Sequence, residues 1–293
     1  MKNTIDRRDF IKTAGATALA ISPIGFLSGC GSRTKAPGSE PQKAGEMTYR
    51  INEAKNDKVS ILGYGCMRWP MKKNEDGKDI IDQEKVNELI DYALEKGVNY
   101  FDAAPVYLQG QCEAATGEAL SRHPRESYFV ATKLSNFNDA SRAEGIRMYK
   151  ASLEAFRTDY LDYYLLHSIK NPATFTKRFV DNGLIDFLME ERKAGRIRNL
   201  GFSFHGNKEG FDELMALHEK YHWDFVQIQL NYMDWNHAGR RNTNASYLQA
   251  ELDKRGIPSI IMEPLLGGRL ADAPDHIADR LKEMAPEGSI ASW

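Results

Sequence analysis

Residues 97–107 read Gly97-Val-Asn-Tyr-Phe-Asp-Ala-Ala-Pro-Val-Tyr107, in which a short apolar run, 99–102, ends on an aspartate. Six further short runs, rich in apolar and β-branched or aromatic residues, recur at 59–62, 128–132, 161–167, 198–203, 225–229 and 258–262. Runs of this length and composition predict β-strands. The sequence therefore contains seven candidate strands, and longer segments separate them.

Most of these longer segments have the periodicity of amphipathic helices. They are residues 81–96, 112–122, 141–157, 184–194, 210–221 and 245–255. Strands that alternate with helices predict a parallel sheet with its helices outside. Seven such strands, with no Gly-x-Gly-x-x-Gly after the first, favour an α/β barrel of the TIM (β/α)8 type; an open, doubly wound sheet is the alternative.

Several of the predicted strands end on polar residues. In a barrel of parallel strands, functional residues gather where the strands end in the carboxyl direction. The polar residues at or just after these ends are Asp102, Tyr107, Lys133, His167, Ser203, His205, Gln229, Asn231 and Glu263. Titratable groups at several different strand ends predict an active site rather than core packing.

The charge of the chain is nearly balanced, with 39 lysines and arginines against 41 aspartates and glutamates and a formal net charge of −2. This balance excludes the broad basic face of a nucleic-acid-binding protein. The three cysteines, Cys30, Cys66 and Cys112, have no Cys-x-x-Cys spacing. We therefore expect neither a metal site nor an iron–sulfur cluster in this chain.

The N-terminus has the pattern of an export signal. Residues 7–12 read Arg7-Arg-Asp-Phe-Ile-Lys12 and precede a weakly apolar run, 14–27, that is too short to span a bilayer. The arginine pair resembles a twin-arginine signal, and Leu27-Ser-Gly-Cys30 resembles a lipobox. We expect residues 1–29 to be the signal, Cys30 to carry a lipid anchor, and 30–46 to be a flexible tether. The protein would then be a membrane-anchored lipoprotein facing the periplasm or cell exterior.

The motifs at the strand ends, taken together, resemble the aldo-keto reductase family. They read Leu62-Gly-Tyr-Gly-Cys-Met-Arg68, Gly97-Val-Asn-Tyr-Phe-Asp-Ala-Ala-Pro-Val-Tyr107, Ala131-Thr-Lys133, Tyr163-Tyr-Leu-Leu-His167, Gly201-Phe-Ser-Phe-His205, Val226-Gln-Ile-Gln-Leu-Asn231 and Met262-Glu-Pro-Leu-Leu-Gly-Gly-Arg269. The resemblance implies that residues 47–293 form the family's barrel. It also implies hydride transfer between NADP(H), with NAD possible, and an aldehyde, a ketone or a sugar-like substrate.

By the same resemblance, the family's catalytic tetrad falls on Asp102, Tyr107, Lys133 and His167. Tyr107 would be the general acid and base for the alkoxide that forms at the carbonyl. Lys133 would lower the pKa of the tyrosine hydroxyl, and Asp102 would keep Lys133 charged and oriented. His167 would hydrogen-bond the substrate oxygen.

The resemblance also implies cofactor contacts. Ser203 and Gln227 would bind the carboxamide of the nicotinamide, and the loop after the seventh strand would bind the diphosphate through its backbone amides. The predicted cofactor-binding residues are Gly65, Cys66, Met67, Ser203, Gln227, Pro264, Leu265, Gly267 and Arg269.

The last segment sets a limit on this prediction. After Arg269 the chain has one helical stretch, 277–284, and ends at Trp293, so we expect the eighth strand–helix unit to be missing. The sequence is either a fragment of a longer protein or a short variant with weakened cofactor binding. The rival functional hypothesis is a non-catalytic barrel that binds or senses a nucleotide or sugar. We expect a monomer whose partner is a small molecule, with membrane contact only through the lipid on Cys30.

Overall fold

The computed structural model describes residues 46–52, 55–138, 140–236 and 244–288. Seven strands form one sheet in the order β11-β10-β9-β8-β7-β6-β3, with every neighbouring pair parallel. They are β3 (Tyr64–Gly65), β6 (Tyr100–Asp102), β7 (Phe129–Leu134), β8 (Leu161–Ile169), β9 (Ile197–Phe204), β10 (Phe225–Gln229) and β11 (Ser259–Met262). Within the described ranges no eighth strand joins β11 to β3. The sheet is therefore the predicted barrel, open between its first and last strands.

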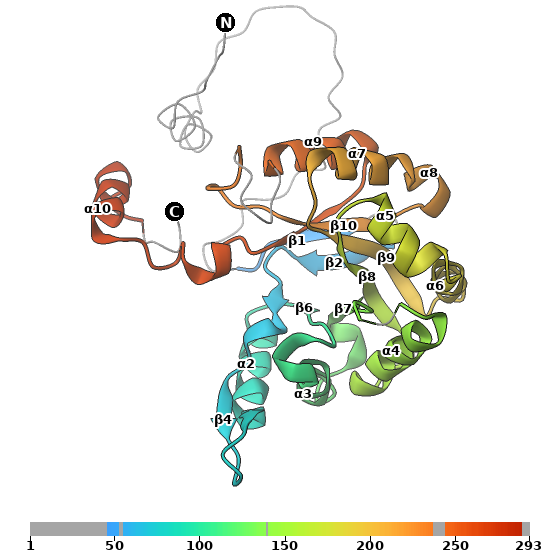
Figure 1. The fold of residues 1–293 in the computed structure, drawn as a ribbon. Coiled ribbons are helices and arrows are strands. Elements are labelled where there is room, and N and C mark those ends of the chain that lie inside the picture. Colours follow the sequence, from blue (N-terminus) through green and yellow to red (C-terminus); the bar gives the residue numbers. More distant parts are fainter. Residues whose placement is uncertain (1–45, 53–54, 139, 237–243, 289–293) are drawn as a thin grey trace, which may run out of the picture. The chain divides into compact units, whose positions relative to one another are not determined.

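The helices lie outside the row of strands (Figure 1). They are α2 (Gln83–Glu95), α3 (Cys112–Leu120), α4 (Arg142–Ala155), α5 (Pro172–Phe175), α6 (Leu184–Lys193), α7 (Lys208–Ala216), α8 (His218–Tyr221), α9 (Ala245–Arg255) and α10 (Asp275–Met284). Side-chain caps set where several of them begin. Asn207 and Asn244 each precede a helix and accept a hydrogen bond from the backbone N–H three residues later, at 3.0 and 3.1 Å.

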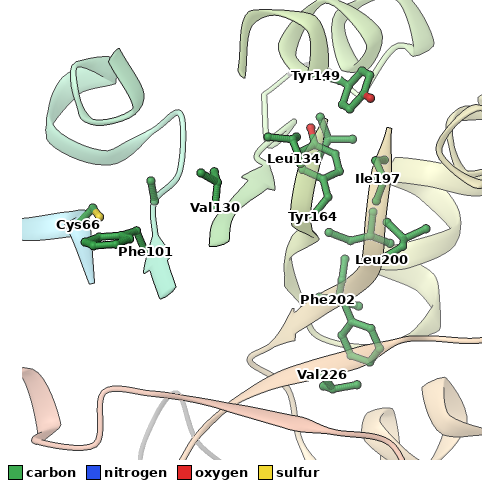
Figure 2. Close-up of a cluster of buried hydrophobic side chains, with 14 of the residues drawn as sticks. Cys66, Phe101, Val130, Leu134, Tyr149, Tyr164, Ile197, Leu200, Phe202 and Val226 are labelled. Carbon is green, nitrogen blue, oxygen red and sulfur yellow. The ribbon is translucent and has the colours of Figure 1, made fainter. Parts of the chain in front are cut away.

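Two hydrophobic regions hold the sheet, because side chains alternate between its two faces. One face packs against the helices, and Figure 2 shows part of this core, including Phe101, Val130 and Tyr164. The other face points into the barrel, where Tyr100, Ala131, Tyr163, Leu165 and Phe225 form a smaller cluster. Since both faces of these strands are covered, the strands read as nearly continuous apolar runs in the sequence.

The predicted strand 59–62 is not a barrel strand. Its first part belongs to β2 (Asp57–Ser60), which pairs antiparallel with β1 (Tyr49–Asn52), and the barrel strand is the two-residue β3. Asn99, just before β6, accepts a hydrogen bond from the Ser60 N–H at 2.8 Å. The β1–β2 hairpin therefore lies at the amino ends of the strands. β3 is too short to produce a pattern, and the apolar residues of the hairpin resembled one.

A network of charges joins this hairpin to the sheet. Arg198 of β9 forms ion pairs with Asp57 of β2 and Asp162 of β8, and the Arg125 Nη2 lies 2.6 Å from Asp162 Oδ2. Both aspartates are buried. A buried carboxylate is stable only when it is paired and hydrogen-bonded, so this network fixes the closed end of the barrel, opposite the predicted site.

The other differences from the prediction are in the segments between the barrel strands. The predicted helix 210–221 is two helices, α7 and α8, and a second hairpin, β4 (Met71–Lys73) with β5 (Asp79–Ile81), precedes α2. Residues 172–180, which had no predicted element, form α5 followed by a π-helix, Thr176–Val180. Phe175 and Phe179 are both buried and four residues apart, a helical signal too short to stand out.

The predictions for the signal (1–29), the lipid anchor at Cys30 and all but the end of the tether lie outside the described residues. Among the helices that are described, none combines the length and the apolar character needed to cross a bilayer.

The fold predicts that two similar substitutions, Gly117→Ala and Gly145→Ala, destabilise the protein to different extents. A Cβ at Gly117 in α3 would lie 2.0 Å from the backbone oxygen of Ala155, whereas one at Gly145 in α4 would meet the side chain of Leu184. Backbone cannot move aside as a leucine rotamer can, so Gly117→Ala should lower the free energy of unfolding by about 2–3 kcal/mol despite the better helix propensity of alanine. Gly145→Ala should cost less. Urea denaturation of both variants measures this, and equal stabilities would contradict it.

Candidate active site

The predicted site residues come together at the carboxyl ends of the strands, on the face that points into the barrel. Asp102 ends β6, Lys133 is next to last in β7, and His167 lies near the end of β8. The side chains two residues earlier on β7 and β8, Ala131 and Leu165, belong to the interior cluster. The period of two along a strand therefore places Lys133 and His167 inside the barrel as well.

Lys133 is the most buried charged group of the site, with a relative exposure of 1%. Its Nζ forms an ion pair with Asp102 and donates to the backbone oxygen of Ala103 at 2.7 Å. Burial acts to lower the pKa of Lys133, but the charge of Asp102 and the interactions with Asp102 and Tyr107 outweigh it and raise the pKa. Lys133 is therefore held as an ammonium.

Tyr107 begins a 3-10 helix, Tyr107–Gly110, beyond the end of β6. Its ring lies 5.1 Å from the Nζ of Lys133 and 5.9 Å, centroid to centroid, from the ring of His167, with the two rings nearly perpendicular. Leu108 and Gln109, which follow it, have left-handed φ values of 50° and 56°. Such conformations are unfavourable for residues other than glycine and are frequent near functional sites.

The pKa of Tyr107 differs from the sequence-based expectation. Burial raises it above its ordinary value, and Lys133 lowers it only part of the way back. The predicted effect of Lys133 therefore has the expected direction, but burial outweighs it, so the pKa of Tyr107 is raised overall. The hydroxyl is protonated at neutral pH, which suits it to donate a proton.

His167 is neutral. Burial, and next the positive charge of Lys133, lower its pKa to about 2. Its Nδ1 lies 2.6 Å from the hydroxyl of Ser135, and its ring contacts that of Phe137. If the Ser135 hydroxyl donates to Nδ1, then Nε2 carries the proton and is the donor available to a ligand.

Arg178 lies on the π-helix and contacts the backbone of His167. The sequence did not predict this residue as part of the site. Its Nη1 donates to the backbone oxygen of His167 at 2.6 Å, and its Nη2 donates to Oδ1 of Asn136 at 2.8 Å. Burial lowers the pKa of Arg178 to about 10, and no carboxylate pairs with it in the part of the chain that the structure describes. A buried guanidinium held by carbonyls, on a π-helix, is typical of a functional site.

A cavity of about 1800 Å³ opens over these residues. Tyr107, Lys133 and His167 line it, as do residues of β3 and β11, so the cavity continues into the gap between these two strands. Its rim includes Lys170 and His205, which follow β8 and β9. The cavity volume therefore includes both the space beside the tetrad and the gap at the open side of the barrel.

The cavity brings most of the predicted cofactor-binding residues together. Those that line it are Gly65, Met67, Ser203, Gln227, Pro264, Leu265 and Gly267. Two do not line it. Cys66 is fully buried, with its backbone oxygen 3.2 Å from the sulfur of Cys112, and Arg269 is exposed outside the cavity.

Two glutamines of β10 connect the cavity wall to its carboxylates. Gln227 Nε2 donates to Oδ2 of Asp102 at 3.0 Å, and Gln229 Nε2 donates to Oε2 of Glu263 at 3.0 Å. Ser203 is nearly inaccessible and accepts a hydrogen bond from the backbone N–H of Ser168 at 2.8 Å. These contacts fix the positions of Ser203 and Gln227 beside the tetrad.

Arg68 is a further cavity residue that the sequence did not single out. It ends the 3-10 helix Cys66–Arg68, and its Nη2 would lie 3.4 Å from a Cβ on Gly267. Gly267 and Gly268 have φ values of 70° and 95°, which favour glycine and leave the backbone of this loop uncovered. The only sequence signal for Arg68 is its place at the end of the first strand motif.

The aldo/keto reductase family profile matches residues 61–290. The chain belongs to the aldo/keto reductase family. The match covers all seven barrel strands and the four tetrad positions, and it confirms the family resemblance of the sequence motifs.

Individual relatives share parts of this aldo/keto reductase. It is 33% identical over 154 residues to the "uncharacterized oxidoreductase YqkF" of Bacillus subtilis, covering 50% of this chain and 45% of that protein. The chain spans about half the length of the curated relatives it matches first.

Solved structures confirm the barrel fold. An aldo-keto reductase from Bacillus halodurans in its holo form is 24% identical, with a TM-score of 0.61 over 78% of this chain and 70% of that one. An aldo-keto reductase from Klebsiella pneumoniae in complex with NADPH is 20% identical, with a TM-score of 0.59 over 82% of this chain and 77% of that one. At these identities the likeness concerns the fold alone.

His167 provides a test of the electrostatics of the site. With its pKa lowered to about 2, the ring should stay neutral as the pH falls from 8 to 4, because burial and the nearby Lys133 disfavour the imidazolium. In proton NMR spectra, one histidine resonance should keep its shift over this range and be missing in His167→Gln. A resonance that is assigned in this way and titrates near the ordinary histidine pKa of about 6.5 would contradict the described environment.

Proposed function

We propose that this aldo/keto reductase transfers a hydride between NADP(H) and the carbonyl group of a small aldehyde, ketone or sugar-like substrate. The observation that carries the proposal is the buried ammonium of Lys133, which contacts Asp102 and lies beside the Tyr107 ring at the floor of the cavity. Burying a charged lysine costs free energy, and a buried ammonium beside a protonated phenol is suited to stabilising an oxyanion.

The cavity suits a nicotinamide nucleotide. The loop at Gly267, with the Arg68 guanidinium beside it, offers a close approach to backbone and a positive charge for a diphosphate. Ser203 and Gln227 would hold the carboxamide next to the tetrad. When bound, the nucleotide supplies or accepts the hydride. The choice of NADP over NAD follows the complex of the Klebsiella pneumoniae relative, titled as containing NADPH.

The residues of the chain would then handle the proton and the developing charge. Nε2 of neutral His167 would donate a hydrogen bond to the substrate oxygen and orient the carbonyl. Tyr107, protonated in the free site, would give its proton to the oxygen as the alkoxide forms. Lys133 would stabilise the resulting phenolate, and Asp102 would keep Lys133 in place. In the oxidation of an alcohol the same groups would work in reverse.

Replacing Tyr107 tests this assignment. Tyr107→Phe removes the hydroxyl and keeps the ring, so turnover of NADPH with a panel of small aldehydes should fall by about 10²–10⁴-fold, the usual contribution of a general acid. Binding of NADPH, followed by quenching of tryptophan fluorescence, should stay nearly unchanged. Loss of binding and turnover to the same extent would contradict the role of Tyr107, and an unaltered turnover would contradict the proposed chemistry.

We also propose that the protein is exported by the twin-arginine route and anchored through a lipid on Cys30. The support is the order of the two sequence motifs, Arg7-Arg8 before the apolar run and Leu27-Ser-Gly-Cys30 after it. One acyl chain alone binds membranes weakly, so stable anchoring requires the several chains of a bacterial lipoprotein.

Cys30→Ala should move the protein from the membrane fraction to the soluble fraction and abolish labelling by radioactive palmitate, because it removes the only thiol in the lipobox. Cys112→Ala is the matched control, since Cys112 is buried in the folded domain. Unlabelled wild-type protein in the soluble fraction would contradict the anchor.

A further inference from the structure

We infer that Glu263 stabilises the oxidised, cationic form of the bound nicotinamide and gives this chain a preference for the oxidised nucleotide. The inference rests on the proposed function, because it assumes a nicotinamide held by Ser203 and Gln227. It concerns a residue outside the catalytic tetrad and a property, the ratio of two affinities, that is distinct from catalysis.

The backbone turns Glu263 toward the cavity. The residue follows the last residue of β11 and has a φ of 51°, in the left-handed region that non-glycine residues rarely adopt. Its backbone oxygen accepts a hydrogen bond from the N–H of Leu266 at 2.9 Å, which fixes the turn. The side chain lines the cavity and reaches across to β10, where Gln229 Nε2 donates to its carboxylate at 3.0 Å.

Gln229 is built into the same wall. It is only 7% exposed and lines the cavity, and its Oε1 is buried with no hydrogen-bond partner among the described residues. A buried amide oxygen without a partner is costly unless a ligand or solvent satisfies it. One end of the Gln229 amide therefore positions Glu263, and the other end is a second acceptor that a ligand could use.

The position relative to the tetrad follows from the strand. Gln227 and Gln229 are two residues apart on β10, so their side chains lie on the same face, about 7 Å apart along the strand. Gln227 holds Asp102, and Gln229 holds Glu263. A nicotinamide ring held at Gln227 would therefore lie about two residues along β10 from the Gln229 amide that holds the Glu263 carboxylate.

The two carboxylates differ in their net charge environment. Asp102 is paired with the ammonium of Lys133, whereas no lysine or arginine forms an ion pair with Glu263 in the described ranges. Arg68, which also lines the cavity, lies beside Gly267. The β10–β11 side of the cavity therefore carries a negative charge with no ion-pair partner among the described residues.

The chemistry of the cofactor makes this charge selective. The oxidised ring carries one positive charge that the reduced ring lacks, while the ribose, diphosphate and adenosine groups are the same in both. A carboxylate near the ring thus attracts only the oxidised form, and contacts to the ribose, diphosphate and adenosine groups cancel in the ratio of the two affinities. Glu263 is exposed, and one charge–charge interaction at such a position is worth up to about fivefold in affinity.

The test is Glu263→Gln, which removes the charge while its amide oxygen can still accept from Gln229. Titrations of the purified chain with NADP⁺ and with NADPH, each by isothermal calorimetry, give the ratio of the two dissociation constants. We expect the variant to bind NADP⁺ about two- to fivefold more weakly and to bind NADPH as the wild type does. Glu75→Gln is the matched control, since Glu75 is an exposed carboxylate near the tip of the β4–β5 hairpin, and it should leave both constants unchanged.

The outcomes separate the two proposals. If both nucleotides bind and Glu263→Gln leaves the ratio unchanged or shifts it toward NADP⁺, the inference about Glu263 is wrong and the proposed function stands. If the wild-type chain binds neither nucleotide, the proposed function itself fails for this chain. A second variant, Glu263→Lys, should shift the ratio further toward NADPH than Glu263→Gln does, and a smaller shift would also overturn the inference.

Discussion

The buried ammonium of Lys133 is the constraint on which the sheet and the site both depend. Placing a charge inside a barrel costs several kcal/mol unless partners surround it. The partners, Asp102 and the backbone oxygen of Ala103, come from the neighbouring strand and the loop after it. A slip of one residue between β6 and β7 would move Lys133 to the helix-facing side and leave Asp102 unpaired. The register of these strands is therefore fixed by the same contacts that prepare the site.

Much of this arrangement was predictable from the sequence, for a physical reason. Strands covered on both faces are nearly continuous apolar runs, so β8 and β10 stand out, and a lysine or histidine at the end of such a run is conspicuous. β3 has two residues and no pattern, and the apolar β1–β2 hairpin took its place. Arg178 could not be found, because its contact with His167 depends on how a π-helix folds back over the end of β8. The pKa of Tyr107 depends on burial, which motifs do not report.

The polar groups at the two ends of the sheet make different kinds of contact. At the amino ends, Arg198 joins Asp57 and Asp162 in ion pairs that tie the hairpin to β8 and β9. At the carboxyl ends, the glutamines of β10 hold carboxylates that line a cavity. Charges at the first end satisfy one another, whereas at the second Glu263 has no cationic partner among the described residues and one amide oxygen of Gln229 is unsatisfied. This contrast separates the groups that stabilise the barrel from those available to a ligand.

Arg178 holds the histidine of the site in place and adds to the positive charge beside it. Burying a guanidinium without a carboxylate partner is unfavourable. Here the His167 carbonyl and the Asn136 amide oxygen accept hydrogen bonds from Arg178, and the guanidinium also lies over the rings of Phe137 and Phe179. The positive charges of Arg178 and Lys133 both oppose protonation of His167, after the larger effect of burial. The same charges favour negative charge on any oxygen that binds between His167 and Tyr107. The buried cations therefore add to the effect of burial in keeping the histidine neutral, and they would also stabilise an oxyanion.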